Sequence, residues 1–285
     1  MTTTEIRFWG VRGSIASPGP KTAGVGGNTS CVEVRCGDTR FVLDAGTGIR
    51  RLGETMLREG PTRTTLLLSH LHWDHIQGLP FFLPAYVSGS EIAIVGAASA
   101  EMTLEETLSH QMRAPVFPVR LAELPAKLGF RHVRPGEALA VGNAQVRVAK
   151  LNHPGGVLAY RIDHAGRSVV YATDTEHYAC VDPALRDLAA GADVLIYDAQ
   201  YTPDEYAGFA GRSKVGWGHS TWEAATAAAG AAGVKRLVLF HHDPQRDDAG
   251  VAAIEASAQA RFTDTVAARE GLTIELEGVA SSRAA

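Results

Sequence analysis

Short apolar or alternating runs of strand length recur along the whole chain, with turn residues between them. The sequence predicts strands at 5–9, 31–36, 40–46, 65–69, 91–96, 145–151, 157–162, 168–173, 193–199, 236–240 and 272–278. The early runs follow one another closely, whereas most of the later ones are separated by helical patterns. This mixture favours an α/β (α+β) layered fold over an all-β barrel.

Helical patterns are predicted at 99–112, 183–190, 220–233 and 247–269. Asp182 before Pro183 is a favourable helix start, and Ser220 with Glu223 three residues later has the spacing of a capping box. No linker divides the chain, so we expect residues 1–285 to form a single domain. Two similar halves are expected to meet near residue 145, although no sequence repeat is visible.

Composition excludes several classes of protein. The chain has 285 residues, of which 45% are hydrophobic and 20% charged, with a formal net charge of −4. These values are typical of a globular protein, and no Lys/Arg run indicates a broad basic patch for nucleic acid. A small anionic substrate remains compatible with this charge, since a metal or a local pocket can supply positive charge.

The cysteines and the N-terminal residues indicate the cellular compartment in which the protein is expected. Cys31, Cys36 and Cys180 form no C-x-x-C pair and are predicted to be buried free thiols. The opening residues MTTTEIRFWG have no signal-peptide pattern, and no apolar stretch is long enough to span a membrane. We therefore expect a cytoplasmic protein that is not bound to a membrane.

The densest chemical feature lies within TTLLLSHLHWDHIQGLP, residues 64–80. His70, His72, Asp74 and His75 form an H-x-H-x-D-H pattern directly behind a run of leucines. Imidazole and carboxylate groups suit zinc, manganese and iron. One such residue in an exposed loop would be unremarkable, but four ligand-type residues at this spacing favour a metal site, with room for two ions about 3.5–4 Å apart.

Further ligand-type residues follow later strands. His153 follows 145–151, Asp174 follows 168–173, and the tandem pair His241 and His242 follows 236–240. Each alone is more often a solvated residue at a strand end. Together they repeat one arrangement, and strand ends are where layered α/β sheets place their binding sites.

This set of residues resembles the metallo-β-lactamase fold hydrolases. The resemblance covers nearly the whole chain and rests on His70, His72, Asp74, His75, His153, Asp174 and His241. It implies a four-layer αββα sandwich with a two-metal site at its rim. Fold alone leaves the substrate open, because this superfamily includes β-lactamases, thioesterases, lactonases, phosphodiesterases and nucleases.

The resemblance also implies how the ligands divide. His70, His72 and His153 would hold one metal, and Asp74, His75 and His241 would hold the other, with Asp174 bridging the two. His241 is chosen because it comes first after its strand, with His242 as the alternative. Zinc is the expected divalent ion, and manganese and iron are the alternatives.

One motif distinguishes between branches of the superfamily. His219 opens a His-Ser-Thr sequence before an Ala-rich helical pattern, which looks like the motif of tRNA 3′-end-processing endonucleases and phosphoribosyl cyclic phosphodiesterases. In that group the histidine acts on the phosphate or the leaving oxygen. Asp198 matches the partner carboxylate, where the nuclease pattern usually has Glu. The alternative for His219 is a helix-capping or exposed residue.

Three other residues are assigned smaller roles. Asp44 lies near the end of the predicted strand 40–46, before a Gly-rich turn, and we expect it to hydrogen-bond a metal-ligating histidine, with plain turn formation as the alternative. Trp73 and Trp217 are predicted to be packing groups, although either could instead stack on a base or ribose.

The leading hypothesis is a binuclear metal-dependent phosphodiesterase acting on a small or cyclic phosphodiester through a metal-bridging hydroxide. Asp74, His219 and Asp198 are the candidate catalytic residues, with His219 as general acid. The alternatives are a lactonase or thioesterase, an RNA-processing endonuclease, and a binding module with a degenerate metal site. A homodimer is a further possibility for its assembly.

Overall fold

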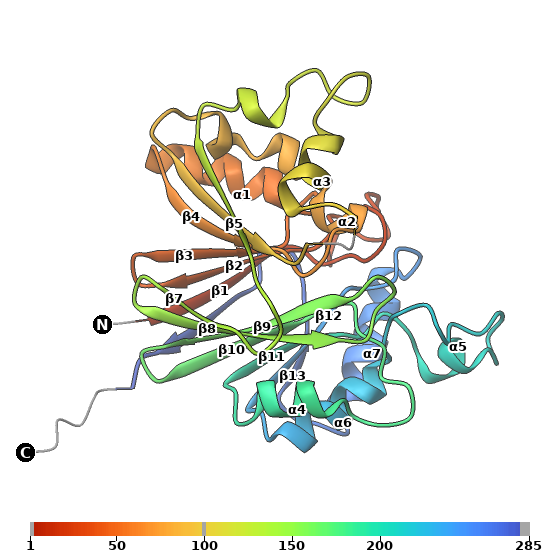
Figure 1. Cartoon of the computed structure of the whole chain (residues 1–285). Coiled ribbons are helices and arrows are strands. Elements are labelled where there is room, and N and C mark those ends of the chain that lie inside the picture. Colours follow the sequence, from red (N-terminus) through yellow and green to blue (C-terminus); the bar gives the residue numbers. More distant parts are fainter. Residues whose placement is uncertain (1–2, 99–100, 280–285) are drawn as a thin grey trace, which may run out of the picture.

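The computed structural model of the chain describes residues 3–98 and 101–279, and the strands of these residues form two seven-stranded sheets (Figure 1). The strands of the first sheet are β1 (Thr3–Gly10), β2 (Cys31–Cys36), β3 (Thr39–Leu43), β4 (Arg63–Leu67), β5 (Glu91–Gly96), β6 (Lys127–His132) and β14 (Thr273–Glu277). Those of the second are β7 (Ala138–Val141), β8 (Ala144–Leu151), β9 (Val157–His164), β10 (Arg167–Ala172), β11 (Val194–Asp198), β12 (Arg236–Phe240) and β13 (Thr265–Ala267).

The two sheets repeat one pairing pattern. In the order β14-β1-β2-β3-β4-β5-β6, strands β1 to β3 pair antiparallel and β3 to β6 pair parallel. In the order β13-β12-β11-β10-β9-β8-β7, strands β8 to β10 pair antiparallel and β10 to β13 pair parallel. The chain passes from the first sheet to the second at 133–137, close to the expected junction between two similar halves, and returns to the first sheet between β13 and β14.

Apolar side chains from both sheets fill the space between them. Phe8 and Phe240 come from opposite sheets, both are fully buried, and their ring centroids lie 6.2 Å apart. Tyr160 reaches across from β9, and its hydroxyl donates to the carbonyl of Leu68 at 2.7 Å. This shared core joins the inner faces of the two sheets.

Helices cover the two outer faces (Figure 1). The helices are α1 (Ile49–Met56), α2 (Trp73–Ile76), α3 (Leu104–Gln111), α4 (Pro183–Ala189), α5 (Pro203–Ala207), α6 (Trp222–Ala232) and α7 (Asp248–Gln259), with short 3-10 turns at Leu57–Glu59, Leu79–Phe81, Leu83–Tyr86 and Leu121–Glu123. Buried residues of α1 and α3 pack on the first sheet, and those of α4, α6 and α7 pack on the second. The predicted four-layer αββα sandwich is therefore confirmed.

Two helix predictions need correction at their ends. The side chain that caps α6 is Thr221, which accepts from the amide of Ala224 at 3.1 Å; Ser220 instead donates to the carbonyl of Thr175. The helix predicted over 247–269 ends at Gln259, because 265–267 pairs with β12 as an edge strand. Helix α3 begins at Leu104, and residues 99–100 of its predicted range lie outside the described residues.

Strand direction gathers the loops that carry the candidate site. Strands β8, β10, β11 and β12 all run the same way, so the loops after their carboxyl ends meet at one edge of the second sheet. The loop after β4 reaches the same edge from the first sheet, because the amide of Leu158 at the start of β9 donates to the carbonyl of Ser69 at 2.8 Å. Among the described residues, no helix has the length and apolar character needed to cross a membrane.

Candidate metal centre

Three histidines form one group at this edge. The ligand atoms of His70, His72 and His153 all lie within 4.8 Å of one another. His153 Nε2 is 3.0 Å from His72 Nδ1, and the other ring nitrogen of His153 donates to the carbonyl of Gly218 at 2.8 Å. The loop after β4 and the loop after β8 therefore bring together the trio that the sequence predicts.

A second group is buried beside the first. It consists of Asp74, His75, Asp174 and His241, whose ligand atoms also lie within 4.8 Å of one another. Asp74 Oδ2 is 3.2 Å from the Nε2 atoms of both His75 and His241. These residues come from the loops after β4, β10 and β12, so this group also joins the two sheets.

Asp174 lies between the two groups and faces each with a different oxygen. Its Oδ1 is 3.2 Å from His75 Nε2 and 3.1 Å from His241 Nε2. Its Oδ2 is 3.7 Å from His70 Nε2 and 3.9 Å from His153 Nε2. A carboxylate in this position has the geometry that a bridging ligand requires.

Hydrogen bonds behind the cluster orient the imidazole rings. His75 Nδ1 donates to Asp44 Oδ2 at 2.7 Å, as expected for Asp44, and His241 Nδ1 donates to Gln200 Oε1 at 2.9 Å. His70 Nδ1 lies 3.0 Å from the hydroxyl of Ser69, which itself donates to Asp44 at 2.8 Å. When a metal binds, these contacts would keep the proton of each ring on Nδ1, so that Nε2 would present its lone pair to the cluster.

The residues present fit a pair of divalent cations. The Nε2 atoms of His70 and His75 are buried and have no hydrogen-bond partner. Burial opposes the charge on Asp74 and Asp174, yet the neighbouring histidines hold the pKa of both carboxyl groups well below the usual range. Burial disfavours a charged His75 ring, but the carboxylates of Asp174 and Asp74 outweigh burial and raise the pKa of His75 well above its usual value. Divalent cations would supply this positive charge in its place.

The tandem histidines have different surroundings. His242 is buried away from the cluster, and its Nε2 donates to the carbonyl of Ala268 at 2.9 Å. Burial lowers the pKa of His242 to about 3, so its ring is neutral. The structure thus brings His241, rather than His242, together with the other six predicted ligands.

His219 lies directly beside the second group. Its Nδ1 donates to Asp198 Oδ2 at 2.8 Å and is 3.9 Å from Asp174 Oδ2. Burial disfavours the charged ring, but the Asp198 carboxylate outweighs burial and raises the pKa of His219 to about 9. Asp198 is fully buried and also accepts from the amides of Gln200 and Ser220. His219 therefore has the orientation and the protonation state of a proton donor. Bound cations would lower its pKa and so offset part of the effect of Asp198.

The backbone around the cluster is strained at three of the predicted site residues. Asp44, Asp174 and His241 have φ angles of 61°, 50° and 61°, in the left-handed region. Such conformations persist only where the surrounding structure holds them, and they concentrate at functional sites. Each residue closely follows a strand, so the bend turns its side chain toward the cluster.

The sequence analysis missed several residues that contribute to the site. Ser69, Gln200 and the carbonyl of Gly218 orient ligand-type histidines, and the amide of Ser14 donates to Asp74 Oδ2 at 2.7 Å. Proximity in sequence to predicted residues could have pointed to Ser69 and Gln200. Ser14 lies in the long loop before β2 and could not have been found without the fold.

Three other predictions are wrong. Trp73 and Trp217 are not packing groups, because their exposed fractions are 75% and 46%. Both occur beside candidate site residues, Asp74 and His219, where exposed aromatic surface is available to a substrate. Cys180 is exposed, whereas Cys31 and Cys36 are buried as expected.

Comparisons with known proteins agree with this geometry. The family described as Beta-lactamase superfamily domain matches residues 39–242. A Ribonuclease Z of Mycobacterium sp. (strain KMS) is 30% identical over 246 residues, covering 80% of this chain and 81% of that protein.

Two solved structures share the fold. The metallo-beta-lactamase fold protein YhfI from Bacillus subtilis has a TM-score of 0.71 and 19% identity, with 97% of this chain and 100% of that chain covered. Human tRNase Z, short form, has a TM-score of 0.65 and 20% identity, with 95% of this chain and 98% of that chain covered. The predictions of fold and of an enzyme are confirmed: this chain belongs to the beta-lactamase superfamily and is a hydrolase of the metallo-β-lactamase fold, which implies divalent metal ions.

Proposed function

We propose that the protein is a binuclear metal-dependent phosphodiesterase that cleaves a small or cyclic phosphodiester. The observation that carries the proposal is the buried His219–Asp198 pair, 2.8 Å apart, set against the residues that would hold the metals. Phosphodiester cleavage needs a proton for the departing alkoxide, and a held imidazolium supplies it. Residues 1–285 would act as one catalytic unit.

The division of the ligands between the two metals would follow the two groups of residues described above. His70, His72 and His153 would hold one ion, and Asp74, His75 and His241 the other, with Asp174 shared. Zinc suits this nitrogen- and oxygen-rich set, and manganese and iron are the alternatives. When bound, such ions lower the pKa of water and neutralise charge on phosphate oxygens.

The chain's own side chains would handle the protons. His219 Nε2 would donate to the leaving oxygen, while Asp198 holds the opposite ring nitrogen and keeps the ring in its charged form. Asp74 is fixed through Oδ2 by the amide of Ser14, so its Oδ1 would accept a hydrogen of the attacking water. Asp198 acts through His219 and is a positioning residue.

An RNA substrate is the second candidate. It is favoured by the relatives named Ribonuclease Z, one of which is 30% identical to this chain. A single-stranded RNA end presents the same phosphodiester chemistry to His219 as a small diester does. Carboxyl-ester hydrolysis by a lactonase or thioesterase remains the third candidate, and it depends less on a general acid.

The test is turnover of bis(p-nitrophenyl) phosphate by protein loaded with zinc, manganese or iron. We expect cleavage with at least one metal, and a loss of about 10²- to 10⁴-fold for diesters with a poor leaving group in His219→Ala. His110→Ala is the matched control, because His110 is an exposed histidine on α3.

Two results would reject the proposal. Protein that binds about two metals per chain but turns over no phosphodiester would favour carboxyl-ester chemistry, to be checked with lactones and thioesters. Fewer than about one metal per chain after growth with ample zinc and manganese would favour a binding module with a degenerate site.

A further inference from the structure

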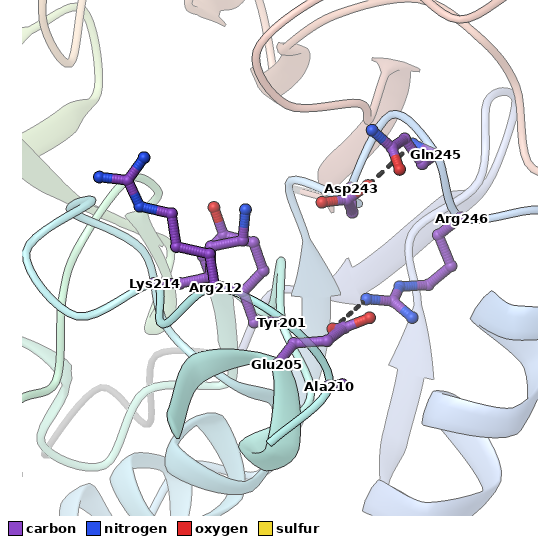
Figure 2. Close-up of a pocket in the computed structure, with 8 residues that line it drawn as sticks. All are labelled: Tyr201, Glu205, Ala210, Arg212, Lys214, Asp243, Gln245 and Arg246. Atoms are coloured by element: carbon purple, nitrogen blue, oxygen red, sulfur yellow. Dashed lines mark hydrogen bonds and ion pairs between the residues drawn. The ribbon is translucent and has the colours of Figure 1, made fainter. Parts of the chain in front are cut away.

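A cavity of about 380 Å³ lies beside the candidate catalytic residues, between the segment after α5 and the loop after β12. Figure 2 shows Tyr201, Arg212 and Lys214 on one side of it and Asp243, Gln245 and Arg246 on the other. Its volume is that of a small-ligand pocket. The roles assigned so far to the seven ligands, His219 and Asp198 use none of these side chains.

Tyr201 connects the cavity to the metal centre. It is 2% exposed, and its ring centroid lies 5.9 Å from that of His219. Its hydroxyl accepts from Gln200 Nε2 at 3.2 Å, and the same amide side chain orients His241. Burial keeps the phenol protonated by raising its pKa, so the hydroxyl hydrogen is available to a bound group.

Two cations in the wall have no acidic partner among the described residues. Arg246 is paired, since its Nη2 donates to Glu205 at 2.7 Å and to the carbonyl of Gln200 at 3.1 Å. In the part of the chain that the structure describes, neither Arg212 nor Lys214 forms an ion pair with an acidic group. Lys214 Nζ instead lies 3.9 Å from the centroid of the Trp217 ring and 5.8 Å from that of Tyr201. The cavity therefore has positive charge to offer to an anion.

The segment that carries these cations is held in place. The amide of Lys214 donates to the carbonyl of Tyr206 at 3.0 Å. The buried carboxylate of Glu176 accepts from the amides of Gly216 and Gly218 at 2.7 and 2.8 Å, and from the hydroxyl of Tyr206. A wall fixed in this way loses little conformational entropy when a ligand binds.

We propose that this cavity binds a second phosphate group of the substrate, one nucleotide unit away from the scissile phosphodiester. The centroid of the Tyr201 ring lies 5.9 Å from that of the His219 ring and 5.8 Å from Lys214 Nζ. A single nucleotide can cover the distance from His219 to Lys214. Arg212 and Lys214 would contact the phosphate, and Asp243 would accept from a sugar hydroxyl. The inference rests on the proposed phosphodiesterase function and narrows its substrate to a diester carrying a second anion.

Calorimetric binding to zinc-loaded protein tests the cavity without requiring turnover. The probes are uridine 3′,5′-bisphosphate and the uridine 5′- and 3′-monophosphates. We expect the bisphosphate to bind at least about tenfold more tightly than the better monophosphate, the gain typical of one charge-assisted contact. In the double variant Arg212→Ala/Lys214→Ala this ratio should fall to about twofold or less.

The matched control removes two positive charges elsewhere. The control variant is Arg63→Ala/Lys127→Ala. These two residues begin β4 and β6, at the ends of the strands opposite the candidate site, so the variant should keep the tenfold ratio. A bisphosphate with no advantage in the wild type, or an advantage that survives in Arg212→Ala/Lys214→Ala, would overturn the inference. The assay with bis(p-nitrophenyl) phosphate remains independent, since that substrate has no second anion and reports only on the proposed function.

Discussion

Asp44 offers the sharpest test of how the metal centre is organised. Its carboxylate is fully buried and accepts four hydrogen bonds: from the amide of Ser69 at 2.7 Å, the hydroxyl of Ser69 at 2.8 Å, His75 Nδ1 at 2.7 Å and the hydroxyl of Tyr171 at 2.8 Å. Three of these four reach Oδ2. Asp44→Asn keeps the shape of this side chain but replaces one acceptor oxygen with a donor.

Neither orientation of the new amide satisfies its neighbours. If the NH₂ group replaces Oδ1, it faces the amide of Ser69, and two buried donors meet at a cost of about 1–3 kcal/mol. If it replaces Oδ2, it faces the proton on His75 Nδ1 and drives that proton to Nε2, the nitrogen that should bind metal. The first outcome disturbs Ser69, whose hydroxyl lies 3.0 Å from His70 Nδ1, and the second weakens the group built from Asp74, His75 and His241.

Loss of such a supporting contact typically lowers metal affinity by about 10- to 100-fold, equivalent to roughly 1.4–2.7 kcal/mol. Zinc titration against a chromophoric chelator should show this loss at one of the two ions in Asp44→Asn. Asp187→Asn is the control, because Asp187 is exposed and, among the described residues, forms an ion pair only with Arg186 on the same helix. A zinc affinity in Asp44→Asn within twofold of the wild type would refute the reasoning.

Four further predictions test other parts of the structure. Gly218→Ala should lower activity by more than about tenfold with an unchanged circular dichroism spectrum, because a Cβ there would collide with the His153 ring at a backbone φ of 86°; unchanged activity would contradict the close approach. Thr221→Ala should cost about 1 kcal/mol in urea unfolding through loss of the α6 cap, and a smaller effect than that of Glu223→Ala would contradict the cap assignment. Ile196→Ala should cost about 2–5 kcal/mol in the same assay, since Ile196 is fully buried between the sheets. Ellman's reagent should titrate one thiol per folded chain and three after denaturation, because Cys31 and Cys36 are buried and burial raises the pKa of the Cys36 thiol to about 12; two fast thiols in the folded chain would contradict this burial.

The sequence predicts the strands that lie inside the sheets and misses most of those at the edges. The runs within β4, β10, β11 and β12 are apolar because neighbours cover both faces. Strands β6, β7 and β13 were missed, and all three are edge strands. β6 alternates exposed and half-buried residues, and β13 has only three residues, so neither leaves a clear apolar pattern.

More of the candidate ligands than of the residues around them could be predicted from the sequence. Imidazole and carboxylate groups at strand ends can be recognised by residue type alone, and the structure brings all seven predicted ligands together. Gln200 and the amide of Ser14 contribute through position rather than chemistry. The exposure of Trp73 and Trp217 likewise depends on loop paths that no local pattern encodes.

Each group of candidate ligands draws on both sheets. His70 and His72 follow β4 and meet His153 from β8, while Asp74 and His75 meet Asp174 and His241 from the second sheet. Metal binding would therefore fasten the two halves of the sandwich together, adding its own free energy to their docking. Either half expressed alone would have an incomplete set of ligands for each ion. Any separation of the two sheets would release both ions together.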